Sequence, residues 1–333
     1  MLIAMILAYF RLRGRLSLPG IVMMMPLLVF PMNCCVNAQQ SPDALPGIDN
    51  TPAVMEGYTR FEATPTKASR KLPKDLRETS ALIWFRGTWW TLNDSGGKPE
   101  VYRLSKSGNR IEQVVALSGV ENNDWEDLAT DGTWLYVGDF GNNGGKRTNL
   151  AVYKVAWINI PNEGNVTLKP QVIRFAWADQ TDLHPKAYRH NFDCEAMFSA
   201  GGSVWLWTKN WNNLNSRLYE LPAQAGSYNL KPVYEFDANL RVTGADYDTN
   251  RRILALVGYI DFLPSVWLFT NFDPKKPADG GRIRIDMTSM AGTQAEGICF
   301  GDNGQLWFSA EKTKVRPQMI YQLNVNTFVR PNL

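Results

Sequence analysis

The feature that most constrains the fold is a unit of about 50 residues that recurs five times after residue 75. Each copy has a short apolar strand, a turn rich in Gly, Asp or Asn, and a second strand rich in Trp, Tyr and Val. The copies follow one another at intervals of about 48, 69, 49 and 52 residues. The first strands are expected at residues 78–84, 125–132, 194–198, 243–248 and 295–300, and the second strands at 89–94, 134–139, 204–209, 253–259 and 306–311.

A third strand is expected after each pair, and a fourth strand follows in four of the copies. Four strands per unit of about 50 residues are typical of a β-propeller blade. We therefore predict an all-β fold, a β-propeller of four-stranded blades, with five blades. A sixth blade would have to lie within residues 156–190, a segment that is short for one. The last copy lacks a fourth strand, and residues 58–64 are expected to supply it and close the ring.

Residues 1–38 have the pattern of a signal peptide. Arg11, Arg13 and Arg15 precede an apolar run at residues 16–32, and Val36-Asn37-Ala38 places small residues at positions −3 and −1 of a cleavage site. The run contains prolines and is shorter than the about 20 residues that span a bilayer. We predict export to the periplasm or the exterior, with no membrane span after cleavage; the alternative is a retained anchor. An N-terminal extension (39–57) and a single propeller domain (58–333) follow.

The net charge of the chain comes from the signal peptide rather than from the propeller domain. The formal charge of +3 equals those three arginines, because residues 1–38 contain no Asp or Glu. Taking three from the 35 basic residues leaves 32, which balance the 32 acidic residues. A neutral domain gives no electrostatic reason to expect a nucleic acid partner. We expect a monomer whose partner is a small molecule or a protein ligand.

Two cysteines lie in the propeller, Cys194 and Cys299, on the inner strands of blades 3 and 5. Blade 4 separates them, and a disulfide requires Cα atoms within about 7 Å. We therefore predict two free, buried thiols.

The main functional signal is a set of glutamates near the starts of four inner strands. Antiparallel pairing brings those starts and the ends of the second strands to one mouth of the channel. Carboxylates gathered there repel one another unless a cation or protons neutralise them. Oxygen donors suit a hard divalent cation such as Ca²⁺, and two histidines without paired spacing argue against zinc. The alternative is a structural role, in which each glutamate accepts backbone hydrogen bonds. The predicted metal ligands are Glu78, Glu126, Glu195 and Glu296.

Other residues near this mouth are candidates for catalysis or ligand binding. Asp139 and Glu311 stand at the ends of second strands, where a carboxylate can activate water. His190 lies in the long crossover before blade 3, where it can act as a general base, or it belongs to a solvated loop. Arg147 is either a ligand contact or the partner of a carboxylate such as Asp139. The candidates for ligand binding are Asn142, Asn143, Arg147, Lys209 and Trp211.

Three motifs resemble a group of exported bacterial β-propeller proteins: Leu92-Asn-Asp-Ser-Gly96, Asn123-Asp-Trp-Glu-Asp-Leu-Ala129 and Gly138-Asp-Phe-Gly-Asn-Asn143, followed by Arg147 and Leu150-Ala-Val-Tyr153. The resemblance is tight over residues 92–155 and looser to the end of the chain. It implies the fold and export more than an activity, since most members of that group are uncharacterised.

More remotely, the chain is similar to the senescence-marker-30/gluconolactonase, strictosidine-synthase-like and propeller-phytase groups. In several of these a divalent cation lies in the central tunnel, which implies Glu126, Glu195 and Glu296 as its ligands here. Lys209, and the lack of an acid near residue 243, depart from that pattern.

Two functions are consistent with these observations. The first is an exported binding or scaffold propeller, with a Ca²⁺-type cation in the channel and a ligand site at its mouth. The second is a metal-dependent hydrolase of the lactonase, esterase or phosphoesterase type that uses the same cation. An enzyme requires exchangeable coordination positions that face a pocket, with a titratable group in reach. Lys209 in blade 3 and the missing acid in blade 4 favour the binding function.

Overall fold

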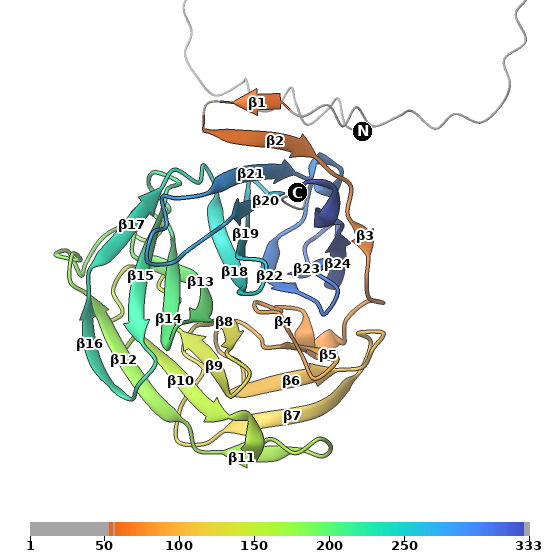
Figure 1. Cartoon of the computed structure of the whole chain (residues 1–333). Coiled ribbons are helices and arrows are strands. Elements are labelled where there is room, and N and C mark those ends of the chain that lie inside the picture. The colour runs from red at the N-terminus through yellow and green to blue at the C-terminus, as the bar shows by residue number, and fades with distance from the viewer. Residues whose placement is uncertain (1–52, 56, 330–333) are drawn as a thin grey trace, which may run out of the picture. The chain divides into compact units, whose positions relative to one another are not determined.

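The computed structural model describes residues 53–55 and 57–329, which form five β-sheets arranged in a ring (Figure 1). The prediction of an all-β propeller with five blades is confirmed. Residues 156–190 add no sixth sheet, since their described strands join blades 1 and 2. Residues 1–38, predicted as a signal peptide, lie outside the described residues. No helix in the described part of the chain is both long and apolar enough to cross a membrane.

Blades 1 and 2 each have four antiparallel strands and a fifth, parallel strand at the outer edge. From inside to outside, blade 1 consists of β4 (Ile83–Phe85), β5 (Thr88–Thr91), β6 (Glu100–Leu104), β7 (Ile111–Leu117) and β11 (Val166–Leu168). Blade 2 consists of β8 (Trp125–Thr130), β9 (Trp134–Asp139), β10 (Ala151–Ala156), β12 (Gln171–Trp177) and β16 (Gly226–Leu230). The fifth strand comes each time from the chain of the following blade, so that neighbouring blades are tied together at their outer edges.

Blades 3 to 5 follow the same order from the channel outward. Blade 3 consists of β13 (Asp193–Ala200), β14 (Ser203–Lys209), β15 (Ser216–Pro222) and β17 (Pro232–Phe236). Blade 4 consists of β18 (Arg241–Asp248), β19 (Ile253–Ile260), β20 (Leu263–Thr270), β21 (Gly281–Asp286), β2 (Tyr58–Glu62) and β1 (Ala53–Met55). Blade 5 consists of β22 (Ala295–Phe300), β23 (Leu306–Ala310), β24 (Met319–Leu323) and β3 (Thr66–Lys67). The described residues also form four short 3₁₀ helices. Three lie between strands, η1 (Lys74–Leu76), η2 (Trp157–Asn159) and η3 (Thr288–Met290), and η4 (Val325–Thr327) follows the last strand.

The N-terminal segment closes the ring with a different strand from the one expected. We expected residues 58–64 in blade 5, but β2 pairs in parallel with β21 of blade 4, and β3 pairs with β24 of blade 5. An ion pair of 2.5 Å between Arg60 and Asp286 holds β2, and the Phe61 ring packs 4.9 Å from that of Phe328. A short alternating strand fits any open sheet edge, and the sequence does not show which edge is open.

The hydrophobic core lies between neighbouring blades. Both faces of a blade are covered by the next blades, so β14 is buried at every position and does not alternate. Trp207 of β14 packs against Phe269 of blade 4, with ring centroids 6.2 Å apart. The predicted free thiols are confirmed, because Cys194 and Cys299 are both buried and unpaired.

β-bulges position the side chains at the channel mouth. The inner strands of blades 2 to 5 each show a register shift near their first residues, at Glu126, Glu195, Thr243 and Glu296. A bulge inserts one unpaired residue and redirects its side chain. In blades 2 to 5 the repeated residue therefore lies in the bulge, which explains why its side chain departs from the regular in-and-out alternation of the strand.

Candidate functional site

The channel mouth contains a pocket of about 190 Å³ whose lining comes from all five blades. Bulge positions of the inner strands supply Glu126, Glu195 and Glu296. Positions at or just past the ends of the second strands add further groups, among them Asp94 and Glu311. Lys209 is the one lysine or arginine that lines the pocket among the described residues. The pocket is therefore strongly acidic, in a domain whose charges otherwise balance.

Glu78 does not belong to the residues that line this pocket. Its side chain is exposed and outside the lining of the pocket, where Ser80 takes the equivalent place. The Ser80 hydroxyl donates to the backbone oxygen of Glu126 at 2.5 Å and lies 3.3 Å from its Oε2. The inner strand of blade 1 enters the channel two residues later than the sequence repeat suggests. The Glu78 backbone oxygen accepts a hydrogen bond from the Asp94 N–H at 3.0 Å, at the end of the strand pair.

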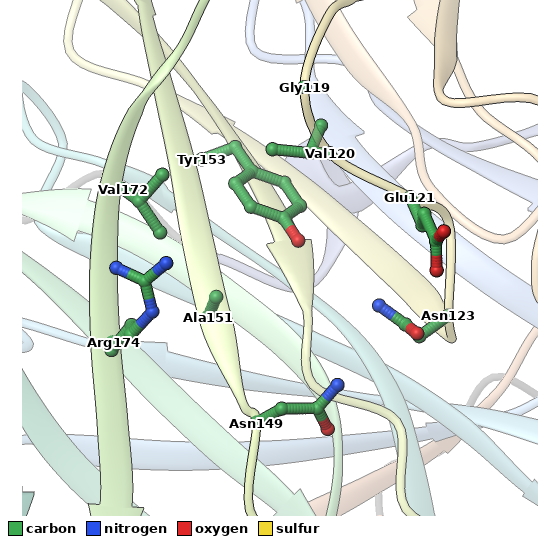
Figure 2. A pocket seen from close by; sticks show the side chains of 9 residues that line it. All are labelled: Gly119, Val120, Glu121, Asn123, Asn149, Ala151, Tyr153, Val172 and Arg174. Carbon is green, nitrogen blue, oxygen red and sulfur yellow. The ribbon is translucent and has the colours of Figure 1, made fainter.

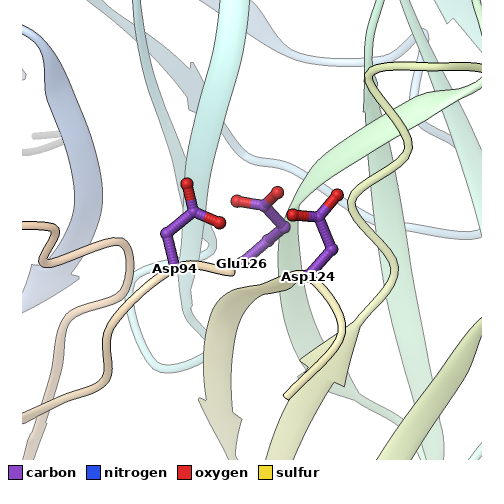
Figure 3. Close-up of side chains that lie close together, drawn as sticks. All are labelled: Asp94, Asp124 and Glu126. Atoms are coloured by element: carbon purple, nitrogen blue, oxygen red, sulfur yellow. The ribbon is translucent and has the colours of Figure 1, made fainter. Parts of the chain in front are cut away.

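Three carboxylates from blades 1 and 2 form a compact trio. Asp94 follows β5, Asp124 precedes β8 and Glu126 is the bulged residue of β8. One oxygen of each lies within 4.8 Å of the others. Figure 3 shows Glu126 between the two aspartates, with the three carboxyl groups side by side.

Gly141 makes room for this trio. A Cβ atom at residue 141 would lie 2.0 Å from Oε1 of Glu126 and 2.6 Å from Oδ2 of Asp124. Any other residue would therefore displace two of the three carboxylates. Gly141 therefore allows both carboxylates to lie close to the backbone of this loop.

Burial and mutual repulsion hold protons on these groups. Burial, with the charges of Asp94 and Asp193, raises the pKa of Asp124 to about 7. Burial and the nearby Glu195 raise the pKa of Glu126 well above its usual range, and burial raises the pKa of Asp94 as well. A cation would replace protons at such a site, because it neutralises the same charges.

Lys209 and Glu195 form a buried ion pair beside the trio. The Lys209 Nζ lies 2.6 and 2.5 Å from the two carboxylate oxygens of Glu195, and both residues are buried. Burial disfavours an ammonium ion, but the charges of Glu195 and its neighbours raise the pKa of Lys209 above its ordinary value. Lys209 already neutralises the Glu195 carboxylate and contacts both of its oxygens. The trio is therefore a better cation site than Glu195.

Blades 4 and 5 supply a second group of titratable side chains across the pocket. Burial, followed by the charges of Asp94 and Glu195, raises the pKa of Glu311 to about 8. Burial and the neighbouring Glu311 raise the pKa of Glu296 well above its usual range. Tyr259, at the corresponding place in blade 4, also lines the pocket.

Asp139 is fully buried and does not line the pocket. Its Oδ1 accepts hydrogen bonds from Arg147 Nη2 at 2.7 Å and from the Asp124 N–H at 3.1 Å. Its Oδ2 accepts from Asn123 Nδ2 at 2.9 Å and from the Tyr153 hydroxyl at 2.8 Å. These four donors occupy both oxygens of Asp139. Arg147 therefore pairs with a carboxylate, which was the alternative to its predicted role as a ligand contact.

The loop after β9 is fixed by residues from the crossover before blade 3. His190 Nε2 donates to the Asn143 oxygen at 3.0 Å, and its Nδ1 accepts from the Phe192 N–H at 3.2 Å. The Asn142 N–H donates to Asp193 Oδ1 at 2.6 Å. Asn143 lines the pocket, whereas Asn142 and His190 do not. Both nitrogens of His190 are engaged in holding the loop.

Aromatic side chains form one wall of the pocket. Trp211 lines it and donates from Nε1 to Asp193 Oδ2 at 2.7 Å. The Lys209 Nζ lies 4.9 Å from the centre of the Trp211 ring. Tyr188, exposed to 56%, packs edge-on against that ring at 4.8 Å. The crossover thus forms a lip at the mouth.

The sequence analysis did not name Asp94 or Asp124 as metal ligands, although Asp94 ends an expected second strand at this mouth of the channel. Each precedes or follows a strand inside a motif that the sequence displays, Asn93-Asp94 and Asn123-Asp124. The repeated Asn-Asp pair in neighbouring copies was the available signal. The two pairs do not occupy equivalent positions in their blades, because Asn93-Asp94 follows a second strand and Asn123-Asp124 precedes a first strand.

No protein-family model matches this sequence, and no curated protein sequence matches it. Among solved structures, the chain is similar to a PQQ-bound aldose sugar dehydrogenase from Streptomyces coelicolor, with 9% identity, a TM-score of 0.47, and coverage of 77% of this chain and 96% of that one. It is similar to regucalcin, a calcium-binding protein from Agrobacterium tumefaciens, with 12% identity, a TM-score of 0.41, and coverage of 80% and 95%. A gluconolactonase from Xanthomonas campestris gives 11% identity, a TM-score of 0.40, and coverage of 77% of both chains. Similarities this low transfer no activity to this chain.

Proposed function

We propose that this propeller binds one divalent cation of the Ca²⁺ type at the channel mouth and uses it to hold a small ligand there. The observation that carries the proposal is the trio of Asp94, Asp124 and Glu126, with oxygens within 4.8 Å of one another. Their chemistry fits the ion, since Ca²⁺ prefers oxygen ligands and carboxylates above all. Ca²⁺ takes 6–8 ligands, so positions remain for water or ligand atoms on the side of the pocket.

The surroundings support a ligand at the same place. The pocket of about 190 Å³ is open at the mouth, and Trp211 and Tyr188 offer aromatic surface at its rim. Asn143 adds an amide within the lining. A cation supplies positive charge to a ligand oxygen, and these side chains supply contacts to the rest of the molecule.

Calorimetric titration of Ca²⁺ into the chelator-treated protein at pH 8 tests the cation site. We expect one site per chain, and a loss of affinity of about tenfold or more in Asp124→Asn, because a ligand charge is removed. Glu78→Gln is the matched control, since Glu78 is an exposed carboxylate that does not belong to the trio. Absence of binding, or equal effects of the two substitutions, would refute the proposal.

The second candidate function is hydrolysis, and Glu311 is the observation that favours it. A carboxyl group with a pKa of about 8 that faces the pocket can give or take a proton near neutral pH. A bound cation would polarise a carbonyl or phosphoryl oxygen of an ester, lactone or phosphoester. In this function Glu311 is the proton donor or acceptor, with Glu296 and Tyr259 around it.

Turnover of a lactone, an aryl ester and an aryl phosphate with added Ca²⁺ separates the two functions. The hydrolase predicts cation-dependent turnover that Glu311→Gln abolishes while Ca²⁺ affinity stays within about twofold. Saturation with Ca²⁺ without turnover of any of the three favours the binding function.

Export is part of the proposal as well. It rests on the basic residues, apolar run and cleavage-site pattern of residues 1–38. N-terminal sequencing of the protein recovered from the periplasm or medium should begin at Gln39. Recovery of a chain that still begins at Met1 would support the retained anchor instead.

A further inference from the structure

A second pocket lies on the outer side of blade 2 and shares no lining residue with the channel mouth. Its volume is about 500 Å³, within the range of small-molecule sites. The linker from blade 1 forms one wall through Val120 and Glu121. Strands β10 and β12 form the floor and the opposite wall through Tyr153 and Arg174. Figure 2 shows the Tyr153 ring between the linker and the β12 side.

Opposite charges face each other across this pocket without pairing. Glu121 and Arg174 both line it, and Figure 2 shows them on opposite sides of Tyr153. Neither side chain makes an ion pair or a side-chain hydrogen bond with a described residue. The pocket therefore presents one anionic and one cationic group that are free to contact a ligand.

The floor between the two charges is fixed and partly apolar. The hydroxyl of Tyr153 donates to Asp139 Oδ2 at 2.8 Å, which locks the ring in the interior of the blade. Val120 and Val172 flank the ring, and the Asn123 amide is held by the same carboxylate at 2.9 Å. A preorganised floor lowers the entropic cost of binding.

We propose that this pocket binds a small zwitterion, namely an amino acid or a short peptide. The ligand ammonium contacts Glu121, its carboxylate contacts Arg174, and its apolar part lies over Tyr153. A ligand with a single charge would satisfy one side chain and be repelled by the other, so a molecule with both charges fits best. The site does not depend on the cation at the channel mouth.

Titration calorimetry with L-alanyl-L-alanine tests the proposal. We expect saturable binding with a Kd of about 1 mM or lower. Binding should weaken about tenfold or more when the ligand is N-acetylated or carries a C-terminal amide, because each change removes one charge contact. Glu121→Gln should remove the preference for the free ammonium, and Arg174→Gln the preference for the free carboxylate. Both substitutions are at exposed side chains, and Arg110→Gln on blade 1 is the exposed control outside the pocket.

Three results would overturn the proposal. They are no saturable binding of the dipeptide, equal binding of D-glucose or of the charge-blocked dipeptides, and binding that persists unchanged in Glu121→Gln and Arg174→Gln. Addition of a chelator should leave dipeptide binding unchanged, which separates this site from the channel mouth.

Discussion

Replacement of Lys209 by Met is expected to destabilise the protein in a manner that depends on pH. The Lys209 ammonium lies 2.5–2.6 Å from both oxygens of Glu195, and both side chains are buried. Methionine has a similar length and no charge, so the variant leaves a buried carboxylate without its partner. Removal of one member of a buried ion pair typically costs about 3–5 kcal/mol.

The dependence on pH follows from the proton that Glu195 must then take up. Burial raises the pKa of Glu195 above its usual value, so in the variant the folded protein binds a proton that the unfolded chain releases above pH 4.5. The free energy of unfolding of the variant therefore falls by about 1.4 kcal/mol per pH unit above that value. In the wild type the charge and hydrogen bond of the Lys209 ammonium lower the pKa of Glu195 against the effect of burial, so this fall is smaller than in the variant.

Urea unfolding followed by tryptophan fluorescence, in chelator at pH 6 and pH 8, measures the effect. The loss should be larger at pH 8 than at pH 6, by up to about 3 kcal/mol, and the double variant with Glu195→Gln should recover most of it. Lys154→Met is the matched control, because the Lys154 ammonium donates to the Ala223 oxygen at 2.7 Å and forms no ion pair among the described residues. A loss below about 1 kcal/mol, or one that is equal at the two pH values, would refute the reasoning.

Two further predictions concern the acidic pocket. Without cation, the free energy of unfolding should fall as pH rises from about 5 to 8 in thermal or urea melts, because the raised pKa values of Asp124 (about 7) and Glu311 (about 8) mean that the folded state holds protons which the unfolded state loses. Saturating Ca²⁺ should remove this fall, and a flat profile in chelator would contradict it. Gly141→Ala should weaken Ca²⁺ binding about tenfold or more, since its Cβ would lie 2.0 Å from Glu126 Oε1. Gly144→Ala, whose Cβ meets nothing within 4 Å, should bind normally in the same titration, and equal affinities in both variants would argue against the trio.

The fold could be predicted because a blade has a fixed physical size. Four strands and their turns take about 50 residues, and the apolar strands repeat at that interval. The strand that closes blade 5 could not be assigned to β3, because β3 has only two residues and carries no hydrophobic pattern of its own. Which sheet has an unpaired edge strand is known only from the assembled ring, and the sequence does not give this information.

The sequence predicts where the candidate site lies, but not which residues form it. Antiparallel pairing predicts that the starts of inner strands meet the ends of second strands, which brings Glu126 and Glu311 to one pocket. The bulges in the inner strands of blades 2 to 5 leave no sequence signature, and a shift of two residues in blade 1 places Ser80 in the pocket lining where Glu78 was expected. The trio joins Asp94 of one blade to Asp124 of the next, a contact between copies that comparison of equivalent positions does not reveal.

The central claim is that a single divalent cation binds at the trio. A crystal of the chelator-treated protein, soaked in Ca²⁺ and measured for anomalous scattering, tests it most directly. We predict one strong peak about 2.3–2.6 Å from oxygens of Asp94, Asp124 and Glu126, with water or ligand atoms on the side of the pocket. A saturated crystal with no peak at the mouth, or with its peak at Glu195 and Glu296 and none at the trio, would contradict the claim.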